Sequence, residues 1–77
     1  MATSDGERLR EARECVAWSV RQVATQLGCN HALVLRWETG DAPTPPAVLR
    51  WLEALALAHA RHPAPTGWRV LRRPDDD

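Results

Sequence analysis

Two short helix patterns lie close together between residues 18 and 40, and a glycine separates them. The first begins after Ser19, which has Gln22 three residues later in the arrangement of a capping box. Its apolar residues recur at helical spacing, at Val20, Val23, Ala24 and Leu27. Gly28 ends this pattern, and Asn30 is placed to cap a second helix over residues 31–38. The spacing predicts two short amphipathic helices joined by a tight turn.

Two further helix patterns flank this pair. The first covers about residues 5–16, with Ser4 or Asp5 as its cap and an apolar face formed by Leu9, Ala12 and Val16. The last covers about residues 45–61, with Thr44 as its cap and Pro45 at its first position. The expected fold is therefore all-α, a small bundle of four to five helices. We expect one domain over residues 5–61 and a C-terminal arm or tail over residues 62–77.

The last predicted helix is apolar around much of its circumference. One stripe contains Val48, Leu52, Leu55 and His59, while further apolar residues lie off that stripe. A helix of this kind is expected to pack against two partners, its own bundle and a second copy of itself. A chain of 77 residues buries only about 60% of its unfolded surface, so a partner subunit would add stability. We expect a homodimer whose interface contains Leu49, Trp51, Leu55 and Ala58.

Composition excludes several classes of protein. No apolar run approaches the length of a membrane span, and the first residues lack the pattern of a signal peptide, so the cytoplasm is the expected compartment. Cys15 and Cys29 are expected to be buried thiols without a disulfide. The net charge is zero, but three of the acidic residues stand together at the end of the chain: Asp75, Asp76 and Asp77. The rest of the chain therefore has a positive net charge.

The sequence contains no pattern typical of an enzyme or a metal site. Four residues could in principle bind zinc, but their spacing matches no common structural zinc site: Cys29, His31, His59 and His62. There is no glycine-rich phosphate loop, and Ser19 is already assigned as a helix cap. We therefore expect no catalysis, no metal, no cofactor and no small-molecule ligand.

Two capped helices joined by a glycine turn are the layout of a helix-turn-helix, whose second helix can enter the major groove of DNA. From Leu9 to about Leu57 the chain resembles the lambda-repressor/Cro-like (XRE) DNA-binding domains. Trp18-Ser19, Val23-Ala24 and Leu27-Gly28-Cys29-Asn30 stand at the family's characteristic positions. Val34, Trp37-Glu38, Gly40 and Pro46 follow in register.

The resemblance implies roles for residues of the second helix. His31, Ala32, Leu35 and Arg36 would face the base edges of duplex DNA. Phosphate contacts would come from Arg13, Ser19, Arg21, Asn30 and Thr39. Structural roles would fall to Trp37 as a core residue and to an Arg13–Glu38 pair that fixes the recognition helix.

Two departures from the family pattern affect the phosphate contacts. The family usually has glutamine where this chain has Val20, and a basic loop where this chain has Asp41. Other arginines could supply the missing contacts, and the tail could act as a basic arm or be a solvated linker. These arginines are Arg10, Arg50, Arg69, Arg72 and Arg73.

The function implied is that of a transcriptional regulator, most simply a repressor that binds a pseudo-palindromic operator as a homodimer. Phage repressors, antitoxins and small regulators encoded beside anti-CRISPR genes use such minimal domains. The alternative is a protein-binding adaptor or antitoxin that keeps the helix-turn-helix scaffold. Val20, Asp41 and the apolar Leu33 and Leu35 favour that alternative.

Overall fold

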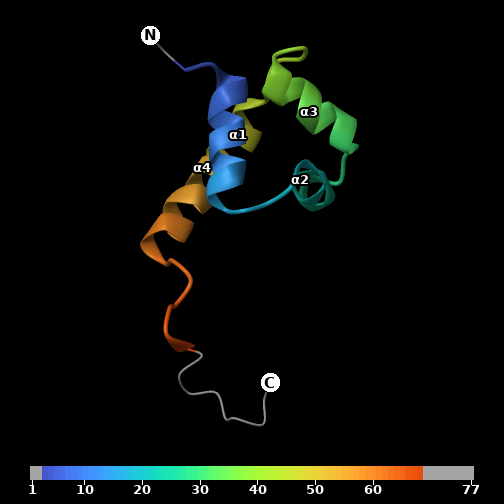
Figure 1. Ribbon diagram of the computed structural model, residues 1–77. Helices are drawn as coiled ribbons and strands as arrows, with labels where there is room; N and C mark the ends of the chain where they lie inside the picture. The colour runs from blue at the N-terminus through green and yellow to red at the C-terminus, as the bar shows by residue number, and fades with distance from the viewer. Residues whose placement is uncertain (1–2, 69–77) are drawn as a thin grey trace.

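The chain folds into four α-helices without a strand in the part that the structure, a computed structural model, describes, residues 3–68 (Figure 1). The helices are α1 (Asp5–Cys15), α2 (Val20–Leu27), α3 (His31–Thr39) and α4 (Pro46–Arg61). α1 packs against both α4 and α3, and α3 also packs against α2. The all-α class predicted from the sequence is confirmed. None of the helices within residues 3–68 has the length and hydropathy needed to cross a membrane.

The helix starts follow the cap residues of the sequence. Ser19 Oγ accepts a hydrogen bond from Gln22 N at 3.1 Å, and Gln22 Oε1 accepts one from Ser19 N at 2.6 Å, so the capping box is complete. Asn30 Oδ1 accepts from Ala32 N at 2.8 Å and caps α3. Gly28 and Gly40 end α2 and α3 in the left-handed conformation, with φ of 72° and 88°. The local chemistry therefore sets both ends of the two central helices.

The start of α4 differs from the prediction. Thr44 does not cap the helix: the N-cap is Pro45, which makes no side-chain hydrogen bond, and Pro46 is the first helical residue. A residue that precedes proline is disfavoured in the helical region, and Pro45 accordingly has φ −61° and ψ 131°. The prediction that Pro45 stands at the first helical position was therefore wrong by one residue.

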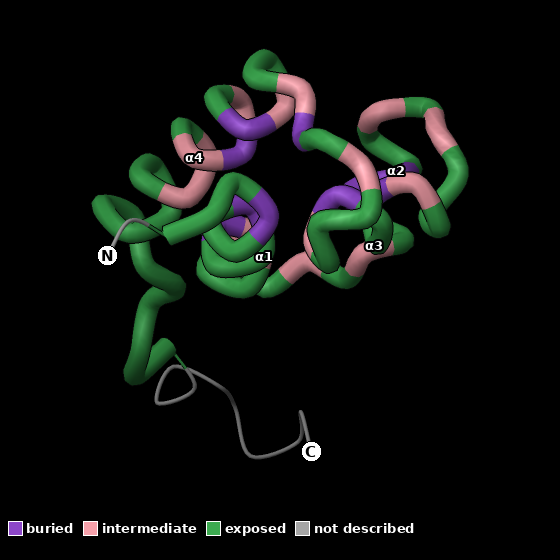
Figure 2. The backbone as a smooth tube through the Cα atoms, turned by 90° about the horizontal axis from the view of Figure 1, so that it is seen from above, coloured by how far each residue is buried: buried purple, intermediate pink, exposed green. Residues whose placement is uncertain are grey.

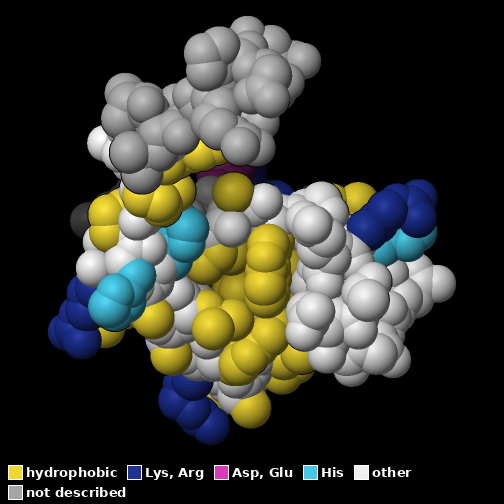
Figure 3. All heavy atoms as spheres, turned by 90° about the horizontal axis from the view of Figure 1, so that it is seen from below, with side chains coloured by type: hydrophobic (Ala, Val, Ile, Leu, Met, Phe, Trp, Pro, Cys, Tyr) yellow, Lys and Arg dark blue, Asp and Glu magenta, His cyan; other side chains and the backbone are white. Residues whose placement is uncertain are grey.

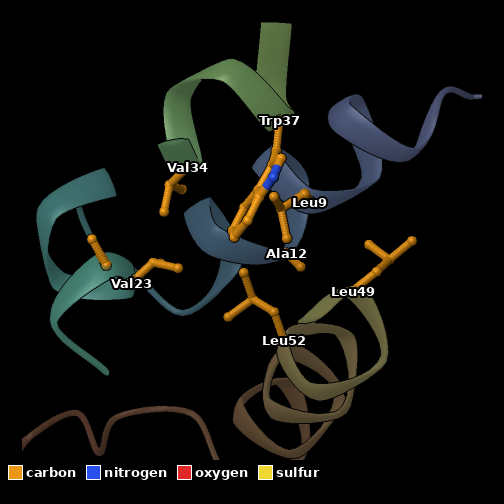
Figure 4. Packing of buried hydrophobic residues seen from close by; sticks show 8 residues of the cluster. Leu9, Ala12, Val23, Val34, Trp37, Leu49 and Leu52 are labelled. Carbon is orange, nitrogen blue, oxygen red and sulfur yellow. The ribbon is translucent and has the colours of Figure 1, made fainter. Parts of the chain in front are cut away.

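One hydrophobic core joins all four helices, and its members come from each of them (Figure 4). Trp37 points from α3 toward Leu9 and Ala12 of α1, as Figure 4 shows. The buried positions of α1 and α4 lie on the sides that face the interior (Figure 2). The core consists of Leu9, Ala12, Val23, Ala24, Val34, Trp37, Leu49 and Leu52.

Two predictions about burial were wrong. Leu49 was expected at a dimer interface, but only 6% of it is exposed and it belongs to the core of the single chain. α4 is apolar on more than one side, and the side that contains Leu49 and Leu52 packs inward. Cys15 was expected to be buried, but it is exposed at the end of α1, while Cys29 is half-buried.

The first turn of α1 lies directly against the last turn of α3. Gly6 is buried there, and a Cβ atom built on it would lie 2.8 Å from the carbonyl oxygen of Glu38 and closer still to that of Trp37. Real Cβ atoms essentially never approach heavy atoms within 3.0 Å. Glycine at this position therefore permits an approach between two backbones that alanine would obstruct.

Candidate nucleic-acid interface

α3 is held in the domain by one side and exposed on the other. Val34 and Trp37 are buried, with 0% and 7% of their surface exposed, and they pack among residues of the other helices. The tight turn at Gly28 joins α3 to α2, which packs against it. Because the inward side carries the packing, the outward side is available to contact a partner.

Arg13 of α1 forms an ion pair with Glu38 of α3 and so connects the two helices. Arg13 Nε donates to Glu38 Oε2 at 2.7 Å, and Nη2 donates to Glu38 Oε1 at 3.0 Å. Only 14% of the Arg13 side chain and 4% of the Glu38 side chain are exposed, so water screens this pair weakly. The hydrogen bond to Glu38 raises the pKa of Arg13, which keeps the guanidinium charged. The pairing implied by the family position is present in the structure.

A third contact of Arg13 was not anticipated from the sequence. Its Nη1 donates to the carbonyl oxygen of Trp18 at 2.9 Å, while Trp18 N donates to the carbonyl of Arg13 at 3.1 Å. Between them the chain turns through Ala17, which has a φ of 61° in the left-handed region. Non-glycine residues rarely adopt this conformation, so the sequence pattern did not predict it. Arg13 thus holds α3 and the connection from α1 to α2 together.

The outward side of α3 presents the four residues expected to contact bases. His31, Ala32, Leu35 and Arg36 are all exposed, and half of the Leu35 surface is accessible. Within residues 3–68, the Arg36 guanidinium forms no hydrogen bond or ion pair, whereas its backbone carbonyl accepts from Thr39 Oγ1 at 3.2 Å and from Ala42 N at 3.1 Å. An exposed guanidinium of this kind can donate two parallel hydrogen bonds to guanine.

The residues expected to contact phosphates are arranged at the helix starts and ends. Ser19 and Arg21 are exposed at the start of α2, Asn30 is exposed at the start of α3, and Thr39 is exposed at its end. Backbone N–H groups at helix starts attract anions. Arg13 differs from the others because it is mostly buried and already paired. Its predicted phosphate contact has no further support from the structure.

The other arginines are distributed over the domain. Arg10 on α1 and Arg50 on α4 are exposed, whereas Arg69, Arg72 and Arg73 lie outside the described residues. The predicted tail segment beyond Trp68 also lies outside them. Asp41, which follows α3, is exposed in the loop between α3 and α4.

The candidate zinc ligands are separated in the fold. Cys29 and His31 flank the start of α3, while His59 and His62 lie at the end of α4. Among residues 3–68, no three His, Cys, Asp or Glu residues are grouped in a way that could hold a metal ion.

Two short helices at a tight turn, the second packed by one side and exposed by the other, define a helix-turn-helix. The chain belongs to the helix-turn-helix domain family, whose model matches residues 6–64. This family assignment agrees with the resemblance seen in the sequence and places the chain among helix-turn-helix DNA-binding proteins. Searches of curated proteins and of solved structures found no match for the chain.

Proposed function

We propose that this protein is a sequence-specific transcriptional repressor that acts in the cytoplasm and binds a pseudo-palindromic DNA operator as a homodimer. The observation that carries the proposal is the outward side of α3. His31 and Arg36 are exposed there, while Trp37 and the Arg13–Glu38 pair hold the same helix rigidly from behind. A helix presented in this way can lie in the major groove with its first residues at the base edges.

The homodimer rests on the outer side of α4. Trp51 and Leu55 are half-buried and Ala58 is exposed, and their spacing places them along one side of the helix. In a symmetric dimer the two recognition helices would read half-sites about 34–36 Å apart, one turn of DNA. A symmetric dimer would present two copies of α3, which a pseudo-palindromic operator requires and a single chain does not provide.

The proposal can be tested by selecting binding sites from a random duplex pool with the purified protein, followed by titrations at several salt concentrations. We expect a pseudo-palindromic site whose affinity falls steeply as salt rises, because phosphate contacts release counterions. A pool without enrichment, together with no salt-dependent binding, would overturn the proposal.

A substitution at Arg36 tests the assigned face. Arg36→Ala should lose about 1–3 kcal/mol of discrimination at one base pair, because a bidentate contact to guanine would disappear. Arg61→Ala is the matched control, since Arg61 is an exposed arginine at the far end of α4. Equal effects of the two substitutions would refute the role of Arg36.

One observation favours a second function, that of a protein-binding adaptor or antitoxin. Leu35 exposes half of its surface in the middle of the face expected to contact DNA. Leucine can contact a thymine methyl group, but it can also anchor a protein partner. A chain that fails the pool selection yet binds a protein through Leu35 would support this second function.

A further inference from the structure

The outward side of α3 carries two apolar side chains beside an arginine that has no ion pair among residues 3–68. Ala32 lies three residues before Leu35 and four before Arg36, so the three side chains are neighbours on one side of the helix. All three are exposed, and half of the Leu35 surface is accessible. We call Ala32 and Leu35 the apolar strip. A partner that covers this side must offer an apolar group close to a hydrogen-bond acceptor for Arg36.

The polar groups of α3 restrict which base edges the helix can read. Its one acidic residue, Glu38, has a side chain that is 4% exposed and paired with Arg13, so no carboxylate of α3 is free for the amino group of cytosine. The helix contains no Asn or Gln, and Asn30 before it uses its Oδ1 to accept from Ala32 N at 2.8 Å. The bidentate amide contact to adenine is therefore not available from α3. Besides the imidazole of His31, this side offers a guanidinium for guanine and apolar carbon for the methyl group of thymine.

The apolar strip is distinct from the broad apolar face of the domain. Hydrophobic side chains gather on that face with histidines beside them (Figure 3), and a hollow there is lined by α4 and the connection between α1 and α2. None of its six lining residues belongs to α3: Val16, Trp18, Leu55, Ala58, His59 and His62. The homodimer proposed above uses α4, so it leaves the apolar strip uncovered.

We propose that the apolar strip contacts the methyl group of a thymine, and that this thymine lies within two base pairs of the guanine contacted by Arg36. Neighbouring side chains on a helix surface are about 5–6 Å apart, and successive base pairs are about 3.4 Å apart, so both contacts fall on one short stretch of the major groove. This inference rests on the DNA binding of the proposed function and names the base edges that α3 reads.

Uracil tests the contact, because it differs from thymine only in lacking this methyl group. The site recovered by the pool selection is synthesised with uracil in place of thymine at one position at a time, and dissociation constants are measured by fluorescence anisotropy at fixed salt. We expect a position in each half-site at which uracil raises the dissociation constant about fourfold, because the apolar contact of one methyl group is lost. A site bound equally well with uracil at every position would overturn the inference.

Two leucine substitutions test whether the apolar strip makes this contact. Leu35→Ala should bring the ratio of the uracil and thymine dissociation constants close to one, while discrimination at the guanine is kept. Leu57→Ala is the matched control, because Leu57 is a leucine of α4 that is 55% exposed, and it should keep the fourfold ratio. Neither substitution removes a core residue, so both variants should fold. A ratio that survives Leu35→Ala would contradict the assignment to the strip.

The position of the thymine is tested against that of the guanine. The base pair at which Arg36→Ala loses discrimination locates the guanine, and a methyl-dependent thymine more than two base pairs from it would refute the proposed arrangement. A selection that recovers no site overturns the proposed function together with this inference. A recovered site without a methyl-dependent thymine overturns this inference alone.

Discussion

Replacing Gly6 with alanine would have two opposing effects on the stability of the fold: a gain in helix propensity and a loss from overpacking. Alanine is favoured over glycine by about 1 kcal/mol in the interior of a helix, and Gly6, in the first turn of α1, can gain at most this much. The new Cβ, however, would lie 2.8 Å from Glu38 O and closer still to Trp37 O, whereas ordinary contact begins at 3.4 Å, so α1 and α3 would have to move apart. The opposing atoms belong to the backbone and cannot rotate aside. Overpacking costs typically 1–3 kcal/mol, and we take about 3 kcal/mol here because no side chain can yield.

The expected net effect of Gly6→Ala is a loss of about 2 kcal/mol, the overpacking cost less the propensity gain. For a domain of this size, that corresponds to a fall in Tm of about 8–16 °C. Thermal and urea unfolding followed by circular dichroism would measure it. Glu11→Ala is the matched control, because Glu11 is exposed on the same helix and should change stability by less than about 0.5 kcal/mol. A Gly6→Ala variant as stable as the original chain would refute the rigid approach of α1 to α3.

Three further substitutions give expected outcomes by urea unfolding. Ser19→Ala should cost about 1 kcal/mol, since it removes the cap from Gln22 N, and a smaller loss for Ser19→Gly would support this cause. Arg13→Lys keeps the charge but cannot make all three hydrogen bonds of the guanidinium, so we expect a loss of about 1–3 kcal/mol; an unchanged stability would contradict the importance of this geometry. Thr44 Oγ1 is buried without a hydrogen-bond partner in the described part of the chain, so Thr44→Val should be neutral or stabilise by up to about 1–2 kcal/mol, and a marked destabilisation would show that the hydroxyl is satisfied.

The helix ends were the most predictable part of the fold. Ser19, Asn30, Gly28 and Gly40 act through backbone groups within four residues of themselves, so their chemistry is visible in the local sequence. The start of α4 was predicted one residue too early, although a proline that precedes another proline is disfavoured in a helix. That rule places Pro46, not Pro45, at the first position.

Features that depend on packing between distant segments were not predictable in the same way. α4 carries apolar residues on several sides, and periodicity alone does not show which side meets α1; Leu49 was misplaced for this reason. Gly6 resembles any glycine near a helix start until α3 is placed beside it. At the candidate site, the family position gave the Arg13–Glu38 pair, but the contact of Arg13 with the Trp18 carbonyl depends on the turn at Ala17.

The division of α3 into a packed side and an outward side has a consequence for changing what the domain recognises. The side chains of His31, Ala32, Leu35 and Arg36 are exposed and lie outside the hydrophobic core. Surface substitutions of this kind usually change stability by no more than about 0.5 kcal/mol. These four positions can therefore be randomised together in a library while most members still fold. New binding preferences can be selected on this scaffold without rebuilding the interior that supports them.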